Sequence, residues 1–139
     1  MIIQGVCLSY KLELFQGIHL PTHDYKIALF TSNATLNKTT TTYIGQTDEV
    51  AGMNYIAGGK ILTGYSPTLI NDTAVLDFDD VVWANATITA RGCLIYNSSL
   101  VGKNTVAVFN FNQDFSSVNN SFVITLPPVG ESTALIRII

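Results

Sequence analysis

Alternating apolar and polar positions run through most of the chain after residue 24 and predict short β-strands. Residues 25–32, YKIALFTS, place Tyr25, Ile27 and Leu29 on one face, and the other face is also fairly apolar. Two apolar faces are typical of a strand that is covered on both sides. Further strands are predicted over residues 60–65, 68–71, 73–78, 81–84, 86–97, 104–112, 120–126 and 133–139.

Turn signals separate these runs. They lie at Asn71-Asp72, at Asp79-Asp80, and over residues 97–104, 112–120 and 127–132, where Asn, Asp, Ser, Gly and Pro gather. Short strands at such intervals are typical of a β-sandwich or a small barrel. We therefore expect a mainly β fold, a single antiparallel β-sandwich domain, jelly-roll-like, that spans residues 1–139.

The N-terminal part fits two patterns. Over residues 6–17 the apolar positions alternate as in a strand, yet Ile3, Cys7, Tyr10 and Leu14 also form a helical stripe, which Gly17 would end as a C-cap. The helical pattern is favoured, so a short N-terminal helix is expected. Residues 1–24 then form an N-terminal segment and loop, and the Gly-rich residues 33–59 form a long loop region.

Arg91 and Gly92 interrupt the centre of the longest predicted strand, ATITARGCLIYN. Gly92 shares a face with Ile88 and Leu94, where it leaves room for a bulge, a bend or a large neighbour. Arg91 is expected to pair with an acid of the preceding LDFDD, which contains Asp77, Asp79 and Asp80. Contact with another subunit or with a ligand are the alternatives for Arg91.

Composition narrows the classes of function. Of the 139 residues only 12% are charged, the net charge is −3, and the seven Lys and Arg are scattered singly. Clustered cations are needed to bind phosphate backbones, so no nucleic acid is expected, and no apolar run is long enough for a membrane span. The opening MIIQGVCLSYKLELF lacks signal-peptide features, so the protein is expected to be made in the cytoplasm and not to be exported by the usual route. Cys7 and Cys93 are then expected to be reduced and buried.

Few residues suggest chemistry. His19, His23 and Asp24 lie in one loop and could in principle move protons or bind a metal, but a solvated loop is the favoured interpretation. Asp77, Asp79 and Asp80 could supply calcium ligands, but strand-end and turn roles explain them better. We expect neither an enzyme nor a bound metal or cofactor.

Two groups of residues are the candidates for contact with a partner. Tyr43, Tyr55 and Tyr65 lie in or beside the Gly-rich region and are predicted to form an exposed contact surface. Ile2, Ile3 and Val6 place apolar side chains at a chain end, where exposure to solvent is unfavourable. Arg91 completes the predicted interface.

Several blocks of the sequence resemble small virion structural proteins of tailed bacteriophages. They are GVCLSYKLELFQGIH, YKIALFTSNATL, TTYIGQTDEVAGMNYIAGGKILTG, ATITARGCLIYNSS, NTVAVFNF and ALIRII, in this order over nearly the whole chain. The resemblance implies a particle component and carries no catalytic residue. It leaves the place of that component, head or tail, open, and our hypothesis is a head decoration, or cement, protein that binds the major capsid protein as a trimer. The alternative is a receptor- or glycan-binding module of a tail or head fibre.

Overall fold

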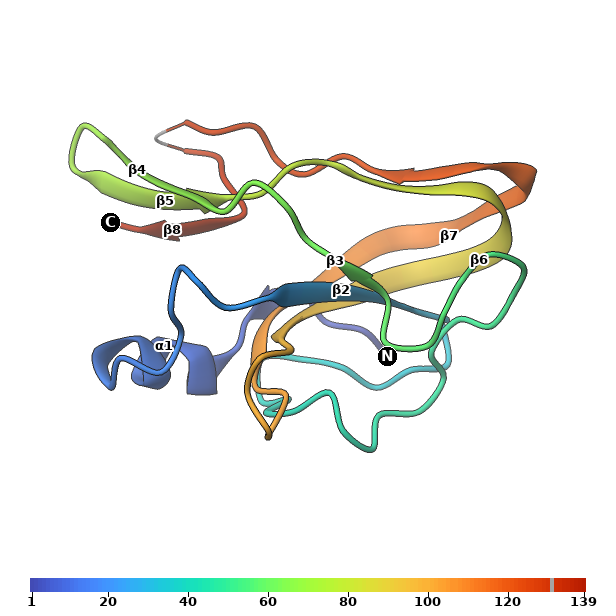
Figure 1. Ribbon diagram of the computed structural model, residues 1–139, viewed down its shortest axis with the longest axis horizontal. Coiled ribbons are helices and arrows are strands. Elements are labelled where there is room, and N and C mark those ends of the chain that lie inside the picture. The colour runs from blue at the N-terminus through green and yellow to red at the C-terminus, as the bar shows by residue number, and fades with distance from the viewer. Residues whose placement is uncertain (131) are drawn as a thin grey trace.

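The computed structural model confirms a mainly β protein with one short N-terminal helix. It describes residues 1–130 and 132–139. Strands make up 48% of the structure and helix makes up 6%. The strands form two antiparallel sheets, so the predicted β-sandwich class is correct. Figure 1 shows the two layers, with the helix at one end of the lower layer.

The larger sheet has five strands in the order β1-β7-β6-β2-β3. Their bounds are Gly5–Val6 for β1, Thr105–Ile124 for β7, Val81–Asn97 for β6, Tyr25–Phe30 for β2 and Lys60–Ile61 for β3. The smaller sheet has the order β4-β5-β8, with bounds Ser66–Ile70, Thr73–Asp77 and Ile136–Ile138. The predicted turn at Asn71-Asp72 joins β4 to β5, and Asn71 has a φ of 52°, which this residue type tolerates.

One long ribbon, β6 paired with β7, contributes to both layers. Its inner part pairs with β2 in the lower layer, where Ile27 lies opposite Ile95. Its outer part, residues 81–90 against 115–124, turns back over the lower layer and continues beside the smaller sheet (Figure 1). The sandwich is therefore formed largely by a ribbon that folds onto itself.

Bulges allow the ribbon to bend. The pairing of β6 with β7 shifts register at four places, one of them between Ala90 and Gly92, which confirms an irregularity at this glycine. A Cβ atom at Gly92 would lie 2.4 Å from the carbonyl oxygen of Phe109, so the strands meet too closely here for any side chain. The turn predicted over residues 112–120 is wrong. Asn112 and Asn119 take a positive φ within a continuous β7, so these Asn-rich residues shape bulges, not a chain reversal.

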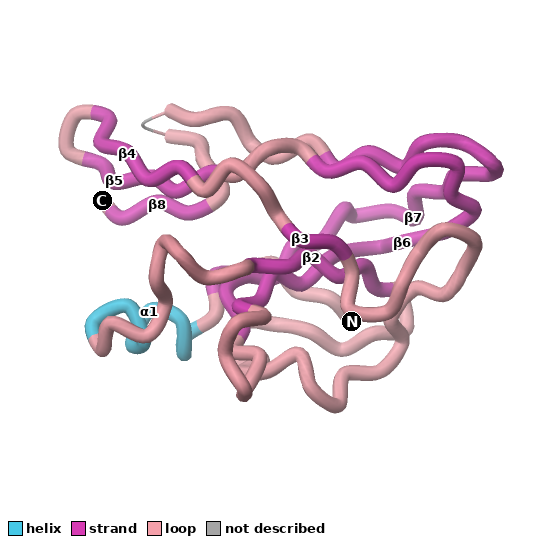
Figure 2. Tube along the Cα trace, in the orientation of Figure 1, coloured by secondary structure: helices cyan, strands magenta, loops and turns pink. Residues whose placement is uncertain are grey.

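Strand β2 lies at the centre of the core. All of its side chains except that of Lys26 are buried, which confirms the expectation of a strand covered on both sides. The folded-over ribbon covers one face, and four buried residues of the loop region 33–59 belong to the same core cluster, Ala34, Leu36, Val50 and Tyr55. Figure 2 shows these residues as loop, and in Figure 1 their first part, coloured cyan, runs below the lower sheet.

Helix α1 spans Leu8–Phe15, which confirms the helical reading of this region. Cys7 is extended and precedes the first turn, and Gly17, with a φ of 69°, follows the last turn as predicted. Tyr10 is the buried residue of the helix, and Leu14 packs against the core. The helix therefore attaches to the sandwich by one face.

Candidate functional site

The three N-terminal residues predicted to form an interface take different positions. Ile2 is only 3% exposed, forms a parallel bridge with Leu36 and packs beside Gly92, so it is a core residue and not a contact for a partner. Ile3 next to it is 53% exposed. Val6 is half-buried in β1 and lines a groove described below. The structure therefore separates Ile2 from the residues that a partner can reach.

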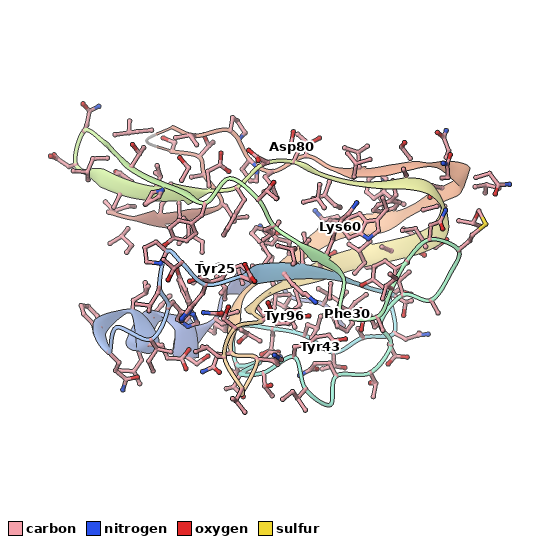
Figure 3. All side chains as sticks on the ribbon, in the orientation of Figure 1. Tyr25, Phe30, Tyr43, Lys60, Asp80 and Tyr96 are labelled. Atoms are coloured by element: carbon pink, nitrogen blue, oxygen red, sulfur yellow. The ribbon has the colours of Figure 1, made fainter. Side chains whose placement is uncertain are left out.

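The tyrosines of the Gly-rich region surround a carboxylate. Tyr43 and Tyr55 both donate their hydroxyl hydrogens to Glu49, with 2.7 Å between Tyr55 Oη and Glu49 Oε2. The backbone N–H of Gly58 donates to the same oxygen at 2.8 Å. The Tyr43 ring stacks on Tyr96 with 4.4 Å between ring centroids, and the two side chains lie close together in Figure 3. This cluster fixes the path of residues 43–58.

These contacts correct the prediction of an exposed tyrosine surface. Tyr55 is buried, and its hydroxyl also accepts a hydrogen bond from the Leu29 N–H at 2.8 Å. Burial, followed by the hydrogen bond to Glu49, raises the pKa of Tyr43 and of Tyr55 above that of ordinary tyrosine. Tyr65 lies elsewhere, stacked on Tyr25 at 5.7 Å between centroids. The three tyrosines do not form one surface.

Arg91 pairs within the chain, but with a different acid from the ones expected. Its Nε lies 2.8 Å from Asp114 Oδ1, and both side chains are partly exposed. Asp79 instead accepts a hydrogen bond from Thr63, and Asp80 accepts one from the Leu126 N–H. The expected acids were neighbours in sequence, whereas Asp114 comes close to Arg91 because β7 continues past residue 112. An exposed pair of this kind contributes about 0–1 kcal/mol.

The two histidines belong to a polar cluster at one end of the sheet. His19 is buried, not solvated as expected, and its Nε2 lies 2.9 Å from Glu13 Oε1. The Asn97 amide nitrogen lies 3.1 Å from His19 Nδ1 and 2.9 Å from His23 Nδ1. Asn97 Oδ1 accepts from the Ser99 N–H, so the amide nitrogen is oriented to donate to both rings.

The geometry of this cluster is that of a structural joint. Its bonds connect α1 through Glu13, the loop through His19 and His23, and the end of β6 through Asn97. Four well-formed cavities among residues 1–130 and 132–139 are lined by other side chains. The same part of the chain contains no group of three or more metal-ligating side chains. Both cysteines are buried and free, as expected.

An apolar groove lies between α1 and β8 and is the main concave feature on this end of the molecule. Its volume is about 540 Å³. Its lining comprises Val6, Tyr10, Lys11, Leu14, Phe15, Ile136, Arg137 and Ile138. A smaller cavity of about 150 Å³ shares four of these residues and extends beneath the small sheet to Tyr65 and Pro67. The larger volume falls within the range of roughly 300–1,000 Å³ that is usual for ligand sites.

The groove is flanked by apolar side chains that the protein leaves in solvent. Phe15 is 95% exposed at the end of α1, and Leu12 and Leu8 on the same helix are also exposed. These three residues follow an i, i+4, i+7 spacing, so they form one stripe along the helix. Across the groove, Ile138 is exposed as well. We call this surface, comprising the groove lining with Leu8 and Leu12, the α1 end.

Sequence reasoning found only part of the α1 end. It used the stripe of Cys7, Tyr10 and Leu14, which is the inward face of the helix. The sequence did contain a signal for the second stripe of Leu8, Leu12 and Phe15. A helix with one buried face needs only one apolar stripe, and these residues are apolar in addition to it. Of the predicted interface residues, Val6 and Tyr65 are the two that line these cavities.

Comparison with known proteins adds no relative to this picture. No protein-family model, no curated protein and no solved structure matches the chain. Within the described residues, no helix combines the length and the apolar character needed to cross a bilayer. A functional proposal therefore rests on the sequence and the geometry of the chain itself.

Proposed function

We propose that the chain is a structural component of a tailed-bacteriophage particle and that it acts as a decoration, or cement, protein of the head. The sequence blocks that resemble small virion proteins support this role. The action is binding alone, with no chemical step.

The observation that carries the proposal is the α1 end. Phe15 is 95% exposed and Leu12 is 59% exposed beside a groove with apolar walls. Contiguous apolar surface of this kind marks sites of interaction with other molecules. A protein that stays attached to a particle would bury these side chains in the contact surface. The scarcity of charged residues, 12% of the chain, is consistent with such a packed environment.

The proposed partner is the major capsid protein, and the proposed assembly is a trimer. A trimer at a symmetry axis would contact several capsid subunits at once. Linked contacts of this kind bind far more tightly than each contact alone, because the second and third are intramolecular. Such bridging would hold neighbouring subunits together against the outward pressure of packaged DNA.

The direct test is to purify the particles made by the virus that encodes the chain and to identify their proteins by mass spectrometry. The proposal predicts the chain at many copies per particle, and labelled antibodies should mark the head in electron micrographs. Its absence from particles would refute the structural role. Light scattering over a range of concentrations tests the trimer separately, and a strictly monomeric protein on and off the shell would contradict that part.

A second candidate, a glycan-binding module of a tail or head fibre, has one observation in its favour. Phe111 and Phe115 stand at 6.2 Å between ring centroids beside a cavity of about 400 Å³ that Ser116, Ser121 and Thr125 also line. Aromatic faces beside hydroxyl groups suit sugar rings. A glycan array would detect this activity, and Phe115→Ala should abolish it. An array with no hits would remove the candidate.

A further inference from the structure

The charge in the groove indicates what kind of occupant it favours. The charged side chains in its lining, Lys11 and Arg137, are both basic, although the chain as a whole has a net charge of −3. Glu13 of the same helix is engaged elsewhere, since its carboxylate bonds to His19 and Asn104. No acidic side chain lines the groove among the residues that the structure describes. A carboxylate on the occupant would therefore be favoured beside Lys11, whereas Arg137 already takes part in an interaction within the protein.

The extent of the apolar surface indicates the size of the occupant. The groove itself holds about 540 Å³, enough for a small ligand. Leu8 and Leu12, however, are exposed outside the groove lining, and Phe15 at its rim is 95% exposed. A small molecule inside the groove would leave these side chains in water. A polypeptide segment could fill the groove and cover the outer stripe of α1 at the same time.

The charges also argue against a second copy of the same chain in a two-fold contact. In such a contact the same patch meets itself, so the basic side chains of one copy would face a patch whose described lining supplies no carboxylate. Like charges at close range oppose association. A partner that brings carboxylates has no such penalty.

We propose that the groove between α1 and β8 binds an apolar segment of a partner protein that carries one or more carboxylates beside its apolar side chains. The inference deepens the proposed function and rests on it for the choice of a protein as partner. Apolar side chains of the segment would contact Tyr10, Leu14 and Ile136, and a carboxylate would pair with Lys11. Phe15 would close over the segment from the end of the helix.

The test uses the full chain and three fluorescent ten-residue peptides. In the first, Leu and Phe alternate with Glu and Ser; in the other two, Gln or Lys replaces Glu. The Glu peptide should bind most tightly, and its affinity should fall as salt is raised. In NMR spectra the amide signals that shift should belong to α1 and β8. Dodecanoate serves as the small-molecule probe.

Two variants and their matched controls locate the site. Lys11→Glu should weaken binding of the Glu peptide by about fivefold and strengthen binding of the Lys peptide. Phe15→Ala should weaken binding of every peptide by about tenfold. The protein should stay folded after this change, because the Phe15 side chain is exposed. Lys60→Glu and Val101→Ala change an exposed lysine and an exposed apolar residue away from the groove, and they should leave peptide binding unchanged.

Three results would overturn the inference. Dodecanoate that binds the groove when no peptide does would make it a small-ligand site. Self-association that Phe15→Ala abolishes would make it a contact between copies. Failure of all probes to shift the amide signals of α1 or β8 would leave the groove without this role.

If the chain is found in particles but the peptides do not bind, only this inference fails. If the Glu peptide binds but particles lack the chain, the proposed function fails and the groove keeps its specificity.

Discussion

Replacement of Glu49 by alanine would remove the acceptor at the centre of the long loop. Glu49 accepts hydrogen bonds from Tyr43, Tyr55 and the Gly58 N–H. Tyr43 is half-buried, so its hydroxyl can turn to water after the change. Tyr55 and Gly58 are buried, and their donors would lose a charged partner. A buried donor without a partner costs about 1–3 kcal/mol, so Glu49→Ala should lower the free energy of unfolding by about 3 kcal/mol.

Glu49→Gln separates the geometry of this site from its charge. The amide oxygen can still accept from Tyr55 and Gly58, and the amide nitrogen can donate to a rotated Tyr43 hydroxyl. The remaining loss is that of charge-assisted hydrogen bonds, which we expect to cost about 1 kcal/mol. The matched control is Asp48→Asn, which removes the charge of the exposed neighbour and keeps a residue that tolerates its φ of 67°. It should change stability by less than about 0.5 kcal/mol.

Urea denaturation followed by tryptophan fluorescence measures these differences, because Trp83 packs against Tyr55 at 6.0 Å between centroids. The midpoints should fall in the order Asp48→Asn, Glu49→Gln, Glu49→Ala, with an unchanged slope. Hydrogen exchange should show faster opening at Val50, whose N–H donates to the Leu29 carbonyl, than at the centre of β6. Equal stability of Glu49→Ala and the unchanged protein would refute the claim that this carboxylate holds the loop.

Three further predictions concern the core. Gly92→Ala should destabilise the fold by about 2 kcal/mol or more in the same assay, since its Cβ would lie 2.4 Å from a carbonyl oxygen of β7. Gly5→Ala is the control, because the added Cβ would lie 3.4 Å from its nearest neighbour. Equal destabilisation by the two changes would contradict the close approach of the strands at Gly92. Burial raises the pKa of Cys93 to about 12 and also raises that of Cys7, so neither thiol should react with a disulfide reagent at pH 8 until the protein unfolds; rapid labelling of the native protein would contradict their burial. Burial raises the pKa of Tyr96 to about 12, above the value of about 10 in an unfolded chain. The Tyr96 hydroxyl is neutral in the folded and the unfolded protein below pH 10, so the free energy of unfolding should fall as the pH rises from about 10 to about 12. Tyrosinate absorbance with a midpoint near pH 10 in the folded protein would contradict this.

The sequence was sufficient where a local pattern decides the structure. The apolar faces of β2 predicted a central strand, and the stripe of α1 with Gly17 predicted a helix of the right place and end. Asn71-Asp72 predicted the β4–β5 turn for a physical reason, the tolerance of asparagine for a positive φ. These features depend on residues close together in the chain.

The sequence was not sufficient where distant segments meet. Asn, Ser and Asp over residues 112–120 are typical of a turn, yet this stretch pairs with β6 and shapes a bend of the ribbon. The choice of Asp114 as partner of Arg91 follows from that pairing. Tyr55 was expected to be exposed because its acceptor, Glu49, cannot be identified until the path of the loop is known. Exposure of Phe15 likewise depends on where α1 lies against the sandwich.

Binding to the head shell is the direct test of the proposed decoration role. Purified protein should be mixed with shells that lack it and sedimented, with Phe15→Ala and the exposed-residue control Val101→Ala measured alongside. We predict saturable binding of the unchanged protein and of Val101→Ala, and at least about tenfold weaker binding of Phe15→Ala. Shells that bind none of the three proteins, or that bind Phe15→Ala as tightly as the unchanged protein, would contradict it.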